Sequence, residues 1–173
     1  MAHYKENIDW IETIGEEMEN FNFDQYKFLD KYSALISITK YILSGKVDKA
    51  GDPIYAHAIR MAASAYLFSY GDDAVAVALF HDLIEDGNDP EAIRKMIKRG
   101  YGSVIYDAVE ILTRKQDQTY MDYIRSIKDS GNDLAIKIKL LDLADHIHYK
   151  ENIKESLLNR YFKARKILHA DIS

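Results

Sequence analysis

The 173-residue chain contains no cysteine, only two prolines and eight glycines, and no long apolar run. Without cysteine, disulfides and thiolate metal sites are excluded, so histidine, carboxylate and water are the only metal ligands that remain. No uninterrupted apolar stretch approaches the roughly 20 residues that a membrane-spanning helix requires. A membrane partner is therefore not expected.

An excess of positive charge is also lacking, because 23 basic residues stand against 28 acidic ones, for a formal net charge of −5. No long basic run occurs, which argues against a nucleic-acid partner. The first residues show no positive segment followed by an apolar core, as a signal peptide would have. We therefore expect a cytoplasmic protein whose partner is a small molecule.

The scarcity of proline and glycine leaves most of the chain free to form helices. Apolar residues recur at three- and four-residue steps, and no segment alternates for long with the period of two that marks a strand. Asp89, Pro90 and Glu91 form a clear helix start, with a capping carboxylate followed by proline. Helices are expected at about 8–18, 24–43, 54–70, 89–100, 103–113, 119–128, 132–147 and 155–168. A further helix, which Asp72 or Asp73 can cap, would carry His81.

A chain of this length is most simply one domain, and it can bury roughly 70% of its unfolded surface without help from a structural metal. The sequence contains no repeat, low-complexity tract or linker. We predict an all-α fold, a compact multi-helix bundle spanning 1–173. Residues 1–40 would form an N-terminal helical extension, and about 46–168 would carry the motifs.

The stretch 77–88, VALFHDLIEDGN, places four titratable groups at the end of an apolar run. On one helix, residues are about 100° apart, so His81 and Glu85 would share a stripe while Asp82 and Asp86 share the next. Four such groups are costly to bury unless a cation lies among them. A divalent metal would supply that cation, and an exposed helix end with ordinary charges is the alternative.

Further possible ligands lie in KLLDLADHIH on the helix predicted near the carboxyl end. Asp142, Asp145 and His146 stand at i, i+3 and i+4, so they share one face beside an apolar stripe. A solvated charged face is the alternative. His57 follows the loop 45–53, where a lone histidine is more often a surface or capping residue.

Two histidines and two aspartates from three helices would make a nitrogen–oxygen site suited to manganese, iron, zinc or cobalt. Such a cation lowers the pKa of a bound water toward neutrality. Glu85 and Asp86 would then be spare carboxylates beside the metal. One could position or deprotonate the water, and the other could protonate a leaving oxygen.

Several pieces of the chain stand in a characteristic order. They are the loop VDKAGDPIYAH, the pairs His81-Asp82 and Glu85-Asp86, VEILTRKQDQTYMDYI from Val109, the KLLD segment and RYFKARKIL from Arg160. This order resembles that of HD-domain metal-dependent phosphohydrolases, and more narrowly the hydrolase domain of RelA/SpoT-type proteins, over about 46–168. The resemblance implies an HD-type helical fold and removal of the 3′-pyrophosphate from (p)ppGpp.

Carried over by position, the resemblance implies four metal ligands: His57, His81, Asp82 and Asp142. It implies that Glu85 and Asp86 activate water and transfer protons, and that Mn²⁺ is the cofactor, with iron, cobalt or zinc as alternatives. The candidate substrate contacts are Lys46, Lys49, Thr113, Arg114, His146 and Tyr161. For the two lysines a solvated loop position is the alternative, and for the tyrosine it is core packing.

The chain departs from the family pattern around the substrate and keeps every metal ligand. The departures are Lys46 for arginine, Val47 for a second basic residue, Ala58 for proline, Leu141 for a small residue and His146 for asparagine. Lysine cannot stack as a flat guanidinium does. The substrate therefore has alternatives: a nucleoside monophosphate or another small phosphoester. A non-catalytic nucleotide-binding regulatory module is a further alternative.

Overall fold

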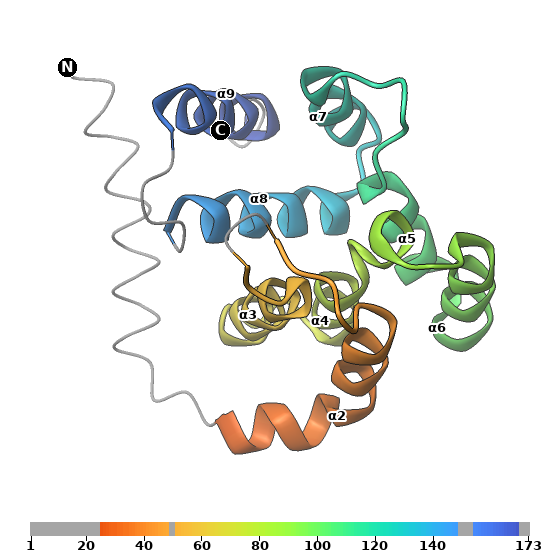
Figure 1. The fold of residues 1–173 in the computed structure, drawn as a ribbon. Coiled ribbons are helices and arrows are strands. Elements are labelled where there is room, and N and C mark those ends of the chain that lie inside the picture. Colours follow the sequence, from red (N-terminus) through yellow and green to blue (C-terminus); the bar gives the residue numbers. More distant parts are fainter. Residues whose placement is uncertain (1–24, 49–50, 149–153, 170–173) are drawn as a thin grey trace.

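The structure, a computed structural model, describes residues 25–48, 51–148 and 154–169. Every regular element within these residues is a helix (Figure 1), apart from an isolated bridge between Val47 and Pro53. The helices are α2 (Gln25–Ile42), α3 (Ile54–Leu67), α4 (Asp72–Phe80), α5 (Leu83–Asp86), α6 (Pro90–Leu112), α7 (Tyr120–Asp129), α8 (Asp133–His148) and α9 (Glu155–His169). The prediction of an all-α multi-helix bundle is confirmed. The helix predicted at 8–18 lies outside the described residues.

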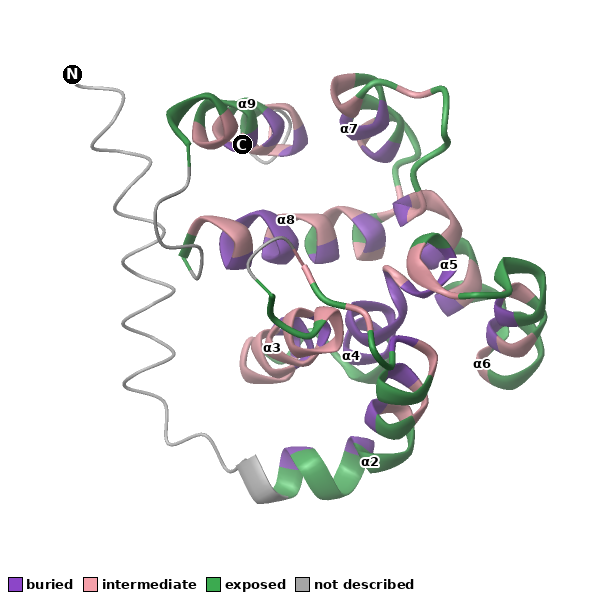
Figure 2. Ribbon diagram, in the orientation of Figure 1, coloured by how far each residue is buried: buried purple, intermediate pink, exposed green. Residues whose placement is uncertain are grey.

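Two helices, α4 and α8, form the middle of the bundle. Every residue of α4 from Ala74 to Phe80 is buried, as expected for a helix that is apolar all round. Helix α8 contacts α3 and α4 as well as α7 and α9, and Figure 1 shows it crossing the molecule between these two pairs. Burial is concentrated along these two central helices (Figure 2). Side chains of α8 therefore reach groups from several helices.

Local signals predicted several helix ends correctly. Asp89 accepts a hydrogen bond from the backbone N–H of Ala92 at 3.0 Å, and so caps α6. The predicted cap of α4 is wrong, because its N-cap residue is Gly71 instead of Asp72 or Asp73. Asp72 instead accepts hydrogen bonds from Lys31 and Tyr32 of α2, both at 2.7 Å. The carboxylate therefore ties α2 to α4.

Helix α6 covers the two helices predicted at 89–100 and 103–113, which are joined across a kink. It contains one non-helical residue, Gly102, with φ 85° and ψ 175°. Residues with a side chain rarely adopt this φ, so glycine allows the kink. The interruption lies two residues after the predicted end at Gly100.

None of the helices that the structure describes is long and apolar enough to cross a membrane.

Candidate metal centre

His57 lies in the first turns of α3 with both ring nitrogens facing carboxylates of α8. Its Nδ1 lies 2.7 Å from Asp145 Oδ2, and its Nε2 lies 3.0 Å from Asp142 Oδ1. Arg60, one turn further along α3, donates two hydrogen bonds of 2.8 Å to Asp145. Asp145 thus receives the Nδ1–H of His57 and directs Nε2 at Asp142. Histidines that bind metals are usually oriented in this way by a carboxylate on the other nitrogen.

His81 lies in the turn between α4 and α5, which corrects the prediction of one helix through Asp86. Its Nδ1 donates to the carbonyl oxygen of Ala78 at 2.8 Å. In an unbroken helix that carbonyl would accept from the N–H of Asp82. The imidazole therefore replaces a helical hydrogen bond and the chain turns. As a result, His81 and Glu85 do not share the predicted stripe of a single helix.

The buried Nε2 atom of His81 faces the candidate metal site. It forms no hydrogen bond with the described residues, although Asp82 Oδ2 lies 2.9 Å away. With Nδ1 committed to Ala78, Nε2 is the nitrogen left for a ligand. A buried polar atom without a hydrogen bond is uncommon in a folded protein, and it fits a metal ligand here.

Three of the four predicted ligands come together. One donor atom each of His57, His81 and Asp142 lies within 4.8 Å of the other two. Donors held about 2.1 Å from one divalent cation stand about 3.0–4.2 Å apart, so a modest contraction would place a cation among them. Asp82 lies beside His81 and outside this group of three. Two imidazoles and a carboxylate suit manganese, iron, cobalt or zinc.

Asp142 is buried at the centre of this arrangement. Its Oδ2 accepts from Lys139 Nζ at 2.5 Å, and its Oδ1 lies 3.1 Å from His146 Nε2. Burial would raise the pKa of Asp142, but the charges of Lys139 and His146 outweigh it and hold the pKa well below its usual range. Asp142 is therefore a charged carboxylate with one oxygen neutralised by lysine.

Asp142 and Asp145 also favour the protonated, positively charged form of His57. Burial would lower the pKa of His57, but its hydrogen bonds to Asp142 and Asp145 raise it to about 10. The metal-free protein thus holds a proton between His57 and Asp142 at neutral pH. A cation bound to Nε2 would replace this proton.

Glu85 and Asp86 follow on α5, near the three converging donors. Glu85 accepts a hydrogen bond from the backbone N–H of Arg114, and Lys46 Nζ donates to the backbone carbonyl of Asp86. Partial burial raises the pKa of Glu85, the Arg114 N–H opposes this, and the charge of Asp82 adds to it. Burial and Asp82 likewise raise the pKa of Asp86. Both carboxyls are therefore better proton acceptors than usual.

A cavity of about 680 Å³ opens beside Glu85 and takes in two predicted substrate contacts, Thr113 and Arg114. Its lining consists of Ile84, Glu85, Pro90, Arg94, Glu110, Thr113, Arg114, Lys115 and Gln116. Thr113 Oγ1 donates to the carbonyl of Val109, and the Arg114 guanidinium donates to that of Gln118. This volume is in the usual range for small-molecule sites.

The remaining predicted substrate contacts lie elsewhere. His146 stacks on His57, with ring centroids 4.7 Å apart, and on Tyr161, at 5.5 Å. Tyr161 is 7% exposed, so core packing accounts for most of its surface. Lys46 is close to the acidic pair through its bond to Asp86. Lys49 lies outside the described residues.

Lys139 and Arg60 are missing from the sequence-based prediction, and Asp145, expected as a possible ligand, instead orients His57. Lys139 stands three residues before Asp142, Asp145 three after it, and Arg60 three after His57. This spacing puts each on the same helical face as a predicted ligand. That spacing was the available signal, but which charged neighbours turn toward the site depends on how α3 packs against α8.

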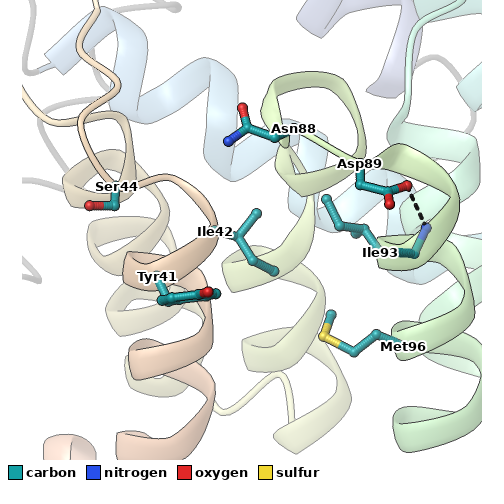
Figure 3. A pocket seen from close by; sticks show the side chains of 8 residues that line it. Tyr41, Ile42, Ser44, Asn88, Asp89, Ile93 and Met96 are labelled. Carbon is teal, nitrogen blue, oxygen red and sulfur yellow. Dashed lines mark hydrogen bonds between the residues drawn. The ribbon is translucent and has the colours of Figure 1, made fainter.

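A second cavity, of about 530 Å³, lies between the end of α2 and the start of α6. Figure 3 shows Tyr41 and Ile42 on one side, and Ile93 and Met96 on the other. Asp89, at its edge, is already engaged in capping α6. No predicted site residue lines this cavity, which is separate from the centre around Asp142.

Comparison with known proteins does not identify a family for the chain. A scan against models of protein families finds none that matches the chain. A search of curated proteins also finds no match. What the protein does must therefore be inferred from its motifs and from the geometry around Asp142.

Proposed function

We propose that this protein is an HD-type, metal-dependent phosphohydrolase that acts on a nucleotide, with (p)ppGpp or a related alarmone as substrate. One observation carries the proposal. His57 of α3, His81 after α4 and Asp142 of α8 bring their donor atoms within 4.8 Å of one another. The order of the motifs in the chain supports the same assignment, because it resembles that of the alarmone hydrolases.

His57, His81 and Asp142 would hold the cation, with Asp82 next to them. When bound, the cation would polarise a phosphate oxygen and make a nearby water more acidic. The chain prepares the site by fixing each histidine through Nδ1. Lys139 keeps Asp142 charged while leaving its Oδ1 toward the histidines.

Glu85 and Asp86 would move the protons. In removal of a 3′-pyrophosphate, the water oxygen forms a bond to the phosphorus attached to the ribose 3′ oxygen, and the bond from that phosphorus to the 3′ oxygen breaks. One carboxylate takes a proton from the water, and the other carboxyl gives a proton to the 3′ oxygen. The raised pKa values of both groups suit this exchange near neutral pH.

The cavity beside Glu85 would take the remainder of the substrate. Arg94, Arg114 and Lys115 give it positive charge, although Arg94 also pairs with Glu91 and Glu110. Cations in a partly enclosed cavity offset the charge on phosphate oxygens. These cations, in a cavity next to Glu85, favour a phosphorylated ligand.

One contact favours a smaller substrate as the second candidate. Lys46 stands where the alarmone hydrolases have an arginine against the nucleotide, and its ammonium donates to the carbonyl of Asp86. An ammonium held in this way does not cover a base as a flat guanidinium would. A small phosphoester without a nucleobase needs no such cover.

The test is a panel of nucleotides incubated with protein that has been stripped by chelator and reloaded with Mn²⁺. Pyrophosphate released from ppGpp supports the alarmone substrate, and orthophosphate from nucleoside monophosphates supports the second candidate. We expect His57→Ala to lose the metal, and Glu85→Ala to keep the metal and lose turnover. Metal and nucleotide binding without any turnover would refute the enzyme and indicate a regulatory module.

A further inference from the structure

The hydroxyl of Tyr120, at the start of α7, is buried and unused. Among the described residues it has no hydrogen-bond partner. The ring is fixed by its neighbours, with the Arg160 guanidinium 4.7 Å above it and Tyr161 at 6.4 Å. A buried hydroxyl without a partner destabilises a fold, so its retention calls for another explanation.

The surroundings of this hydroxyl connect it to the metal centre. Tyr161, which packs on Tyr120, stacks on His146, and His146 contacts Asp142. Burial raises the pKa of Tyr120 to about 12, and the charges of Lys139 and Asp142 both act on the group. The hydroxyl therefore stays protonated at neutral pH and can donate a hydrogen bond.

Tyr123, one turn later on the same helix, shows what a structural tyrosine looks like here. Its hydroxyl donates to the carbonyl of Leu112 at 2.5 Å, and its ring packs under Lys139 Nζ at 5.0 Å. The two tyrosines thus share a helix and a neighbourhood. Only Tyr123 uses its hydroxyl to hold the fold together.

We propose that Tyr120 and Arg160 form an anion subsite beside the metal centre, in which the Tyr120 hydroxyl donates to a phosphate oxygen of the ligand. This inference rests on the proposed function and names a part of its substrate site. Arg160 supplies a positive charge, whereas the charge of Lys139 is already paired with Asp142. A neutral hydroxyl beside a cation matches an oxygen that carries partial negative charge. A cationic ligand would be repelled, and an apolar one would leave the hydroxyl unpaired.

Inorganic pyrophosphate is a suitable probe. Its binding is measured by calorimetry on Mn²⁺-loaded protein from which free metal has been removed, and stability is measured by thermal denaturation without the probe. We expect Tyr120→Phe to be at least as stable as the wild type, because no hydrogen bond in the fold is lost. Its affinity for pyrophosphate should fall by about 10- to 100-fold, as for loss of a hydrogen bond to a charged group. Arg160→Met should also bind more weakly.

Tyr123→Phe is the matched control, with the same atom removed three residues away. It should lose stability and bind pyrophosphate like the wild type. The inference is overturned if Tyr120→Phe binds pyrophosphate as tightly as the wild type, if it is less stable, or if the wild type does not bind pyrophosphate. Pyrophosphate binding that depends on Tyr120, without turnover of any nucleotide, would sustain the subsite and refute the proposed reaction. If Tyr120→Phe leaves turnover unchanged, the proposed reaction is sustained and the subsite is refuted.

Discussion

Replacing Asp145 by asparagine should weaken metal binding, although Asp145 is not one of the three converging donors. Its Oδ2 accepts from His57 Nδ1 at 2.7 Å, and Arg60 donates to both of its oxygens at 2.8 Å. An asparagine keeps the shape but presents an NH₂ group to surroundings made of donors. In either orientation of the amide, one bond to Arg60 is lost, and His57 loses a charged acceptor.

The size of the effect follows from these contacts. Removing a carboxylate that orients a metal-binding histidine costs about 10- to 100-fold in metal affinity, or about 1.4–2.8 kcal/mol. Breaking a fully buried ion pair costs about 3–5 kcal/mol of stability. The Arg60 side chain is 36% exposed, so water can solvate it, and we expect a smaller loss of about 1–3 kcal/mol.

Calorimetric titration of chelator-treated protein with Mn²⁺ measures the affinity, and urea denaturation measures the stability. Asp107→Asn is the control, because it makes the same chemical change at an exposed position of α6. Both variants are first checked for wild-type helicity by circular dichroism. If Asp145→Asn is folded and binds Mn²⁺ with wild-type affinity, the orientation of His57 by Asp145 is not needed and the reasoning fails.

Two further substitutions test the charges around the centre. The pKa of Glu85 is higher in the folded protein than its value of about 4.3 in the unfolded chain. The wild type should therefore gain stability relative to Glu85→Gln as the pH falls from the folded pKa toward the unfolded pKa. At pH 7 Glu85→Gln should need at least as much urea to unfold as the wild type does, and it should lose turnover. A variant that is less stable but fully active would contradict this. Lys139→Met leaves Asp142 buried without its lysine, so the metal-free protein should lose about 3–5 kcal/mol. Added Mn²⁺ should raise its melting temperature more than that of the wild type, and an equal rise would show that the cation does not compensate Asp142.

Helix positions were predictable where the deciding contacts are local. Asp89 caps its own helix three residues away, and Gly102 allows a kink at its own position. The break at His81 was not predictable from periodicity, because an apolar run continues through it on both sides. It depends on the imidazole turning back to Ala78 while its other nitrogen faces buried carboxylates. Such an orientation is decided by packing between helices.

The ligands were easier to predict than the residues that orient them. His57, His81 and Asp142 stand in motifs whose order is visible in the chain. Arg60 and Asp145 are separated by 85 positions and meet only because α3 packs against α8. Charged residues at the border of an apolar stripe are common, so a single sequence does not show which of them turn inward. Tyr120 was missed for the same reason, among 13 tyrosines.

Cation binding tests the central claim most directly. Chelator-treated protein is titrated with Mn²⁺ and, in parallel, with Zn²⁺, using wild type and His81→Ala. If His57, His81 and Asp142 form a metal centre, the wild type binds one cation per chain, and His81→Ala, folded by circular dichroism, loses that site. A wild-type protein that binds neither cation, or a His81→Ala variant that binds like the wild type, would contradict the metal centre and the phosphohydrolase proposal together.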